Sequence, residues 1–280
     1  MNGNKNKRIV LKFGSEGLTD PGGVNEDVIS HIVEDVKNLS QNGYRVAIVT
    51  SGALSIGAEI VGLWGIPSDQ VKRRVLSGVG QCKLMNIYQK HFGNTLVIQG
   101  LVTEDNFKTA KAMADIRDSV FETWSMGAIP IFNYNDFVAS EELEAEEKLN
   151  GNDHTAYMIA EAIDAGTLAL FTNVDGLHTD NPNGNPDAKL IPYVRELSDE
   201  IRCIATGDCS AVGTGGMVTK VRYCWDFVSA KPGERKAYVL NINKPGLITG
   251  LLLNGAHYGT EFYCQEEVNL IEKAIGYGRE

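Results

Sequence analysis

Hydrophobic and polar positions in the first fifty residues predict a strand, a helix and a second strand. Residues 8–13 (RIVLKF) form a short, mostly apolar run that contains β-branched residues. Apolar residues then recur at helical spacing from Val28 to Leu39, and Asn25 is the expected N-cap. Residues 44–50 (YRVAIVT) are a nearly continuous apolar run, which is typical of a strand buried on both faces of a parallel sheet.

The same alternation of helical and strand patterns continues to residue 242. The predicted helices span residues 70–92, 106–124 and 155–165, and a further one includes residues 217–228. The predicted strands span residues 95–102, 128–132, 168–171 and 237–242. Alternating strands and helices indicate an α/β fold with helices on both faces of a mainly parallel sheet. No linker-like segment or internal repeat divides the chain, so we expect residues 1–280 to form a single domain.

Charge and composition then restrict the classes of function. The chain has 26 Lys+Arg and 36 Asp+Glu, a formal net charge of −10, which argues against broad nucleic-acid binding or attachment to an anionic membrane. No apolar run approaches the roughly 20 residues of a membrane-spanning helix, and the N-terminus lacks a signal-peptide pattern. The five cysteines are scattered without CxxC pairs, which predicts reduced thiols and a cytoplasmic location. The histidines show no HExxH spacing, so we expect no metal site built from side chains.

Glycine is the residue type in excess: 30 of the 280 residues are glycine, about 11% against roughly 7% in an average protein. Gly14 follows the first predicted strand, Gly52 follows the second, and Gly78 and Gly80 lie in the segment SGVGQ. Glycine lets a backbone approach a phosphate closely, and helix N-termini add unpaired N–H donors. These glycines therefore predict phosphate-facing turns at the carboxyl ends of the strands.

Residues 213–220 (GTGGMVTK) are the strongest local signal. They are not a Walker A loop, because Thr219 precedes Lys220, and no GxGxxG follows the first strand as in a dinucleotide-dependent oxidoreductase. Lys220 falls early in the following helix, where the helix dipole favours anions, so a bound phosphate would explain its position. Lys12 interrupts a strand that is expected to be central, where burying an unpaired ammonium is costly. Two lysines converging on one phosphate would suit phosphoryl transfer.

Taken in order, the motifs resemble the amino acid kinase family, and most closely its glutamate 5-kinases. The matching segments cover nearly the whole chain: VLKFGS, VTSGALSIG, SGVGQ, IPIFNYNDFVA, NGNDHTA, FTNVDGLHTDNP, GTGGMVTK and NKPGLITGLLLNG–GTEF. The resemblance implies a three-layer αβα sandwich around an open, mainly parallel sheet of about eight strands. Many glutamate kinases carry an additional C-terminal PUA domain, for which this chain ends too soon.

The resemblance also implies an activity. Family members transfer the γ-phosphoryl group of ATP, with Mg²⁺, to a carboxylate, carbamate or phosphate oxygen. For a glutamate kinase the acceptor is the side-chain carboxylate of glutamate and the product is γ-glutamyl phosphate, a step of proline biosynthesis. We therefore expect a small amino-acid or carboxylate substrate and a homo-oligomer.

Matching positions imply roles for individual residues. Lys12 and Lys220 correspond to the two lysines that stabilise the transferring phosphoryl group, and Asp153 to the aspartate that orients them. The acceptor side comprises Ser51, Gly52, Asp136 and Asn152. The nucleotide side comprises Lys12, Gly14, Thr172, Asn173, Asp175, Thr214, Gly215, Gly216, Met217 and Lys220. From the residues alone, Asp136 could instead form an Asx-turn and Asp153 could cap the next helix.

Two acceptor-side positions depart from the usual pattern of glutamate kinases. Tyr134 stands where these enzymes commonly have the acid of NEND, and Gly151 where they have the first acid of GDND. The segment between Asp136 and Asn152 is also longer and carries five glutamates within residues 141–147. Two alternatives to a glutamate kinase therefore stay open. One is a kinase for a modified, N-substituted or carrier-bound glutamate or another small acid, and the other is a nucleotide or amino-acid sensor without catalysis.

Overall fold

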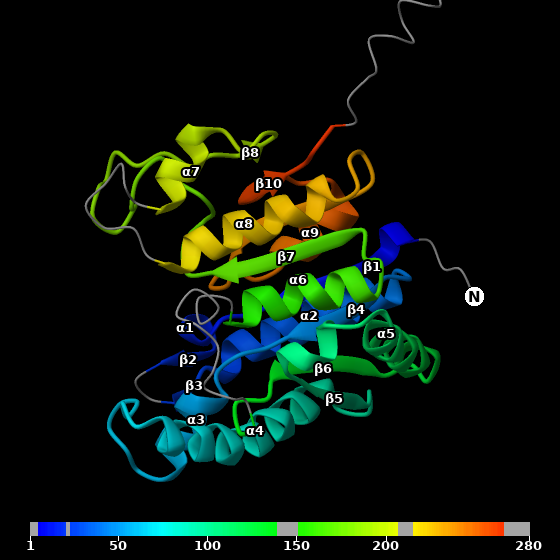
Figure 1. The fold of residues 1–280 in the computed structure, drawn as a ribbon, viewed down its shortest axis with the longest axis vertical. Helices are drawn as coiled ribbons and strands as arrows, with labels where there is room; N and C mark the ends of the chain where they lie inside the picture. The colour runs from blue at the N-terminus through cyan, green and yellow to red at the C-terminus, as the bar shows by residue number, and fades with distance from the viewer. Residues whose placement is uncertain (1–4, 21–22, 139–150, 207–214, 266–280) are drawn as a thin grey trace, which may run out of the picture.

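The computed structural model describes residues 5–20, 23–138, 151–206 and 215–265, and an eight-stranded sheet forms its centre (Figure 1). The strands are β1 (Arg8–Lys12), β4 (Arg45–Val49), β5 (Val97–Val102), β6 (Ile129–Tyr134), β7 (Thr167–Thr172), β8 (Tyr193–Val194), β9 (Lys236–Asn241) and β10 (Thr260–Phe262). Their spatial order is β5-β6-β4-β1-β7-β9-β10-β8. Neighbours pair in parallel except β9 and β10, which are antiparallel. The predicted sheet is therefore confirmed.

Helices cover both faces of this sheet (Figure 1). One layer contains α2 (Glu26–Gln41), α4 (Gln70–Phe92) and α9 (Leu247–Asn254), and the other contains α5 (Ala110–Ser125), α6 (Gly151–Ala162) and α8 (Gly215–Ser229). Strand β1 contributes to both cores, because Ile9 and Leu11 pack into the first layer and Val10 into the second. This alternation explains why the strand is apolar on both faces, and it confirms the three-layer αβα sandwich.

Shorter elements connect these layers. They are the 3₁₀ helices η1 (Lys5–Lys7) and η2 (Glu104–Phe107), the helices α1 (Ser15–Leu18), α3 (Ala53–Ile60) and α7 (Asp199–Thr206), and the small hairpin of β2 (Thr19–Asp20) and β3 (Gly23–Val24). Every helix in the described part of the chain is too short or too polar to span a membrane.

Capping side chains set where the long helices begin. Asn25 accepts a hydrogen bond from the backbone N–H of Val28 at 3.1 Å, as its position predicted. Asp69 caps α4 in the same way through Lys72, at 2.7 Å, and this helix has the predicted bounds. Helix α5 begins four residues later than predicted, because η2 occupies the preceding residues and Thr109 provides the cap.

The prediction that Gly78 and Gly80 form a phosphate-facing turn is wrong, because both lie inside α4. A Cβ on Gly80 would lie 1.9 Å from the carbonyl oxygen of Ala53, and one on Gly57 would lie 1.8 Å from that of Leu76. Neither position tolerates a side chain, so these glycines let the backbones of α3 and α4 pack in direct contact.

The cysteines also differ in part from expectation. Cys82, Cys224 and Cys264 are free thiols, as predicted. Cys203 is disulfide-bonded, so the expectation of reduced thiols is wrong at this position. Spacing along the chain does not reveal which cysteines a fold brings into contact, and this is why the sequence was misleading here.

Candidate active site

A cleft of about 620 Å³ lies at the carboxyl ends of the central strands. Its volume is within the range of small-molecule sites, roughly 300–1,000 Å³. Its wall combines residues from β1 and α1, from the start of α6, from the segment after β7 and from the first turns of α8. Open parallel sheets bind ligands at this edge, so the position agrees with the expected one.

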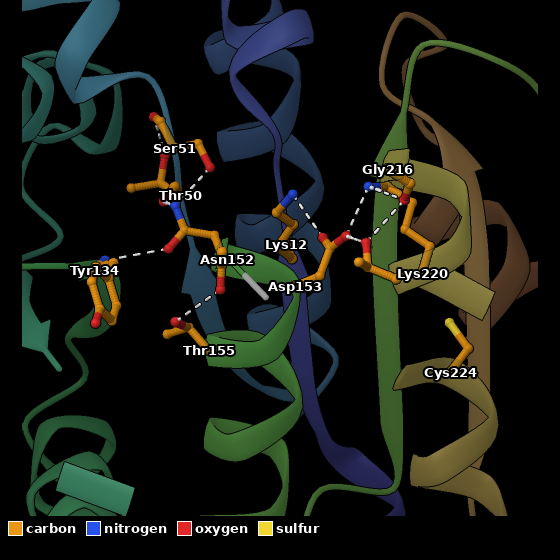
Figure 2. Close-up of polar contacts among 12 residues, drawn as sticks. Lys12, Thr50, Ser51, Tyr134, Asn152, Asp153, Thr155, Gly216, Lys220 and Cys224 are labelled. Atoms are coloured by element: carbon orange, nitrogen blue, oxygen red, sulfur yellow. Dashed lines mark hydrogen bonds and ion pairs between the residues drawn. The ribbon is translucent and has the colours of Figure 1, made fainter. Parts of the chain in front are cut away.

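Two lysines and one aspartate meet in this cleft, and we call them the lysine–aspartate cluster (Lys12, Asp153 and Lys220). Lys12 Nζ lies 2.7 Å from Asp153 Oδ1, and Lys220 Nζ lies 3.0 Å from Asp153 Oδ2 (Figure 2). The three residues are only 6%, 5% and 7% exposed, respectively. The structure therefore brings together the three residues predicted to act in phosphoryl transfer, and it does so through direct ion pairs.

Each member of the cluster comes from a different element. Lys12 is the last residue of β1, whose backbone pairs with β4 at Val49 and with β7 at Leu170. Asp153 lies in the first turn of α6, and Lys220 lies in the second turn of α8. Since β1 is a strand of the sheet and α6 and α8 pack against it, the geometry of the cluster is set by the fold.

Further hydrogen bonds hold the carboxylate of Asp153 in place. Thr219 Oγ1 donates to Asp153 Oδ2 at 2.9 Å, and Lys220 Nζ also donates to the carbonyl oxygen of Gly216 at 3.3 Å. Thr219 belongs to the GTGGMVTK segment, but no role is predicted for it from the sequence. Its position directly before Lys220 is the signal that could have identified it.

The electrostatics leave one excess positive charge in the cluster. Burial opposes ionisation of Asp153, but the ammonium groups of Lys12 and Lys220 outweigh burial and lower its pKa to about 2. Burial lowers the pKa of Lys12, as does repulsion from Lys220, while attraction to Asp153 opposes this shift. Two buried ammonium groups thus share one carboxylate, an arrangement that attracts an anionic ligand such as a phosphate.

Asn152, the neighbour of Asp153, faces the opposite direction (Figure 2). Its amide Nδ2 lies 2.9 Å from the carbonyl oxygen of Thr50 and 2.7 Å from Ser51 Oγ, and it donates to both. Its Oδ1 accepts a hydrogen bond from the backbone N–H of Tyr134 at 3.3 Å. Consecutive residues of α6 therefore join the ends of β4 and β6 on one side to the lysine–aspartate cluster on the other. Of the predicted acceptor-side residues, Ser51 and Asn152 line the cleft.

The two predicted glycine turns that follow β1 and β4 behave differently. Gly14 lines the cleft beside Lys12, and a Cβ at this position would lie 3.4 Å from Lys12 Nζ. Gly52 adopts φ 98°, in the left-handed region that favours glycine, and its turn packs against Leu18 and Thr19 of the α1–β2 segment. Gly52 itself does not contribute to the cleft wall.

Two predicted carboxylates also lie outside the cleft wall. Asp136 accepts a hydrogen bond from Ser77 Oγ at 2.7 Å, and burial raises its pKa despite this bond. Asp175 Oδ1 lies 2.5 Å from Lys244 Nζ and also accepts a hydrogen bond from Asn241 Nδ2 at 2.9 Å. Both side chains thus have protein partners, which sequence motifs alone do not reveal.

Of the residues predicted to contact the nucleotide, Thr172, Asn173, Gly216 and Met217 line the cleft. Gly215 is the first residue of α8. Thr214 and the glutamates of residues 141–147 lie outside the described residues. The structure adds cleft residues without a predicted role, and these include Ser15, Glu16, Gly17, Gly176, His178, Asp180, Asn181 and Asn183. Most of them belong to the motifs VLKFGS and FTNVDGLHTDNP, so their signal was proximity to assigned residues.

The two unusual acceptor-side positions have no carboxylate to offer. Gly151 is the exposed first residue of α6 and lines the cleft. Tyr134 ends β6, and burial together with the nearby carboxylate of Glu104 raises its pKa. At these two positions the structure thus offers a phenol and a bare backbone.

Comparison with known proteins gives consistent results. The model of the amino acid kinase family matches residues 7–241. The glutamate 5-kinase of Dehalococcoides mccartyi strain 195 is 37% identical over 224 residues, covering 79% of this chain and 60% of that protein. The glutamate 5-kinase of Geobacter metallireducens is 33% identical, and the match covers 94% of this chain and 69% of that protein. The glutamate 5-kinase of Streptococcus thermophilus is also 33% identical, and the match covers 77% of this chain and 82% of that protein. The chain thus spans 60–70% of the length of several of these relatives.

Solved structures share the fold at low sequence identity. An isopentenyl phosphate kinase superposes with a TM-score of 0.62 at 19% identity, covering 91% of this chain and 99% of that one. The UMP kinase from Bacillus anthracis gives 0.60 at 19% identity, with 92% and 96% covered. On the extent of the family match and the shared fold, this chain belongs to the amino acid kinase family.

Proposed function

We propose that this protein is a kinase that transfers the γ-phosphoryl group of ATP to the side-chain carboxylate of glutamate or a glutamate-like acid. The lysine–aspartate cluster carries this proposal. It places two buried ammonium groups and one carboxylate in the wall of a single cleft, so the cluster has a net positive charge. Phosphoryl transfer depends chiefly on positioning and on stabilising the charge of the migrating group. The relatives named glutamate 5-kinase support glutamate as the acceptor.

In the proposed reaction, a carboxylate oxygen of the acceptor forms a bond to the γ-phosphorus as the bond from phosphorus to the β–γ bridging oxygen breaks. The products are an acyl phosphate and ADP. The acceptor needs no general base, because a carboxyl group is already ionised near neutral pH. Lys12 and Lys220 offset the negative charge of the phosphate oxygens, and Asp153 keeps both ammonium groups in position. The use of ATP also agrees with the expected cytoplasmic location.

Mg²⁺ would accompany ATP as the usual counter-ion of its phosphates. The described residues include no group of three His, Cys, Asp or Glu side chains that could hold a metal ion. The carboxylate of Asp153 is engaged by two lysines, so it is a poor candidate for a metal ligand. The residues therefore fit a Mg²⁺ ion that is held mainly through phosphate oxygens and water, and that reduces the charge of the transferring group.

A changed acceptor is the second candidate, and Tyr134 and Gly151 favour it. Neither residue supplies a carboxylate, so an acceptor with a substituted amine is compatible with this region. A sensor without catalysis is less well supported, because a pure binding protein has no need of an aspartate that aligns two lysines.

A screen of acceptors with ATP, Mg²⁺ and hydroxylamine tests the proposal, because hydroxylamine converts an acyl phosphate to a hydroxamate. We expect hydroxamate formation and ADP release with glutamate or a close analogue, from a panel of glutamate, N-acylglutamate, aspartate and glutamyl peptides. A much higher kcat/KM for N-acylglutamate or a peptide than for glutamate would favour the changed acceptor. ATP binding without ADP release for the whole panel would contradict a kinase.

We also propose that the protein forms a homo-oligomer through an apolar surface on α3, the following loop and α4. We call it the α3–α4 surface, and its members are Ile60, Val61, Leu63, Trp64, Ile66, Val71, Val75 and Val79. Trp64 is 99% exposed, and Val71, Val75 and Val79 recur on one face of α4. Monomeric soluble proteins rarely leave a large apolar patch uncovered.

Replacing Trp64 with serine is expected to lower the oligomer's molecular mass in multi-angle light scattering, measured over a range of protein concentrations. The loss of the largest exposed apolar side chain removes contact area from the proposed interface. Met126→Ser is the control, since Met126 is 61% exposed at the C-cap of α5, which belongs to the other helical layer than α4. An unchanged mass for the Trp64 variant would exclude this surface as the interface.

A further inference from the structure

Three carboxylates line the cleft among the described residues, and they differ in what they contact. Asp153 is paired with two lysines. Asp180 accepts hydrogen bonds from the backbone N–H of Asn181 at 2.7 Å and from Asn185 Nδ2 at 2.9 Å. Glu16 has no hydrogen-bond or ion-pair partner among the residues that the structure describes. It is thus a cleft carboxylate with no assigned contact.

The packing of α1 fixes where Glu16 lies. Gly17 approaches Ile242 so closely that a Cβ on it would lie 2.3 Å from the Ile242 side chain. Leu18 is fully buried beside Gly52, on the side of the cleft that carries Ser51. The inner side of this short helix is therefore occupied by packing, and Glu16 is left exposed at the cleft.

Glu16 is also close enough to the reacting groups to matter electrostatically. Its negative charge favours the protonated form of Lys12 and so acts against the lowering of the Lys12 pKa by burial. Only Phe13, Gly14 and Ser15 separate it from Lys12 along the chain. A ligand cation in contact with Glu16 would therefore lie in the same cleft as a ligand carboxylate bound beside the lysine–aspartate cluster.

An amino-acid acceptor brings two kinds of charge to this cleft. Its reacting carboxylate is attracted by Lys12 and Lys220, whereas its protonated amine needs a negatively charged partner. Tyr134 and Gly151 supply none, and Asp136 is bonded to Ser77 outside the cleft wall. Among the residues that the structure describes, Glu16 is the cleft carboxylate that remains available for this contact.

We propose that Glu16 binds the ammonium group of the acceptor and makes the enzyme prefer amino acids to simple dicarboxylic acids. This inference rests on the proposed carboxylate kinase activity. It assigns a specificity-determining residue that acts on the acceptor and leaves the phosphoryl donor unaffected.

The test compares glutamate with glutarate, which has the same two carboxylates but no amine, in the native protein and in Glu16→Gln. We expect kcat/KM for glutamate to fall about ten- to hundredfold in the variant, which is the scale of a hydrogen bond to a charged group. For glutarate the loss in kcat/KM should be much smaller, since it reflects only the changed charge beside Lys12, so the ratio between the two acceptors should fall toward one. KM for ATP should be unchanged, and Glu16→Asp, which keeps the charge, should retain part of the preference.

Glu34→Gln is the matched control, because Glu34 is an exposed residue of α2 and lies outside the cleft wall. This variant should keep the native ratio of glutamate to glutarate. Equal losses for both acceptors in Glu16→Gln, with a changed Mg²⁺ dependence, would place Glu16 on the metal–nucleotide side and overturn the inference. An unchanged ratio would overturn it as well. A native protein that phosphorylates no carboxylic acid at all would instead overturn the proposed function.

Discussion

Lys220→Ala is expected to lower kcat by about 10²–10³, the scale of one lost donor to the transition state. Lys220 is buried, and its ammonium group forms an ion pair with Asp153 in the cleft, where the migrating phosphoryl group would pass. Steady-state measurement of ADP release at saturating ATP and acceptor checks this value. The expected change is in kcat more than in KM, because the interaction strengthens as charge develops.

Arg222→Ala is the matched control for this variant. Arg222 lies on the same helix two residues further on, but its side chain is exposed and pairs with Asp226. Its removal should leave turnover near the native value. Near-native turnover in Lys220→Ala would refute the assigned role, provided that the variant retains the native circular dichroism spectrum.

Asp153→Asn is expected to destabilise the protein as well as to abolish most of its activity. The substitution leaves two buried ammonium groups without their shared counter-charge, and breaking a buried ion pair costs about 3–5 kcal/mol. Urea denaturation at pH 7 measures the free energy of unfolding, and the same preparation measures turnover. Asp115→Asn is the control, since Asp115 forms an exposed pair with Lys111 on α5 and should change neither quantity.

The same aspartate predicts a specific response to acid. Its pKa is about 2 in the folded protein, against an ordinary value of 3.8, so the ion pairs stabilise the fold fully above about pH 4. This contribution is lost as the pH falls toward 2, because the unfolded chain then binds the proton more readily than the folded one. The native protein should therefore lose stability more steeply than Asp153→Asn between about pH 4 and pH 2. Equal slopes for the two proteins would contradict the low pKa.

Local signals in the sequence were sufficient for much of the fold. The bounds of α4 follow from features within the segment itself, including the capping Asp69 and the glycine at position 93, whose φ is 66°. The predicted start of α5 was wrong, and the reason also lies in the segment itself: Thr109 caps the helix, and a 3₁₀ turn precedes it. The sheet followed from the alternation of apolar strands with helices.

Features that depend on tertiary contact were harder to predict. A glycine in a turn and a glycine at a helix–helix contact look alike in sequence, which is why Gly80 was misassigned. Likewise, the motifs could not show that Ser77 binds Asp136 or that Lys244 binds Asp175. The convergence of Lys12 and Lys220 was predictable because a lysine in a buried apolar strand is costly without a charged partner. An exposed residue such as Glu16 is solvated and carries no such cost, so its position gives no signal.

The interior position of β1 has a consequence for how the chain assembles during synthesis. β1 precedes both β4 and β7 in the sequence, yet it lies between them in the sheet. Its partner β7 begins at Thr167, so one edge of β1 has no native neighbour until all the residues between Lys12 and Thr167 have been synthesised. An unpaired strand edge is a template for wrong pairing and aggregation. The nascent protein therefore passes through a long stage in which one edge of β1 is open to wrong pairing, and this stage ends only when β7 joins the sheet.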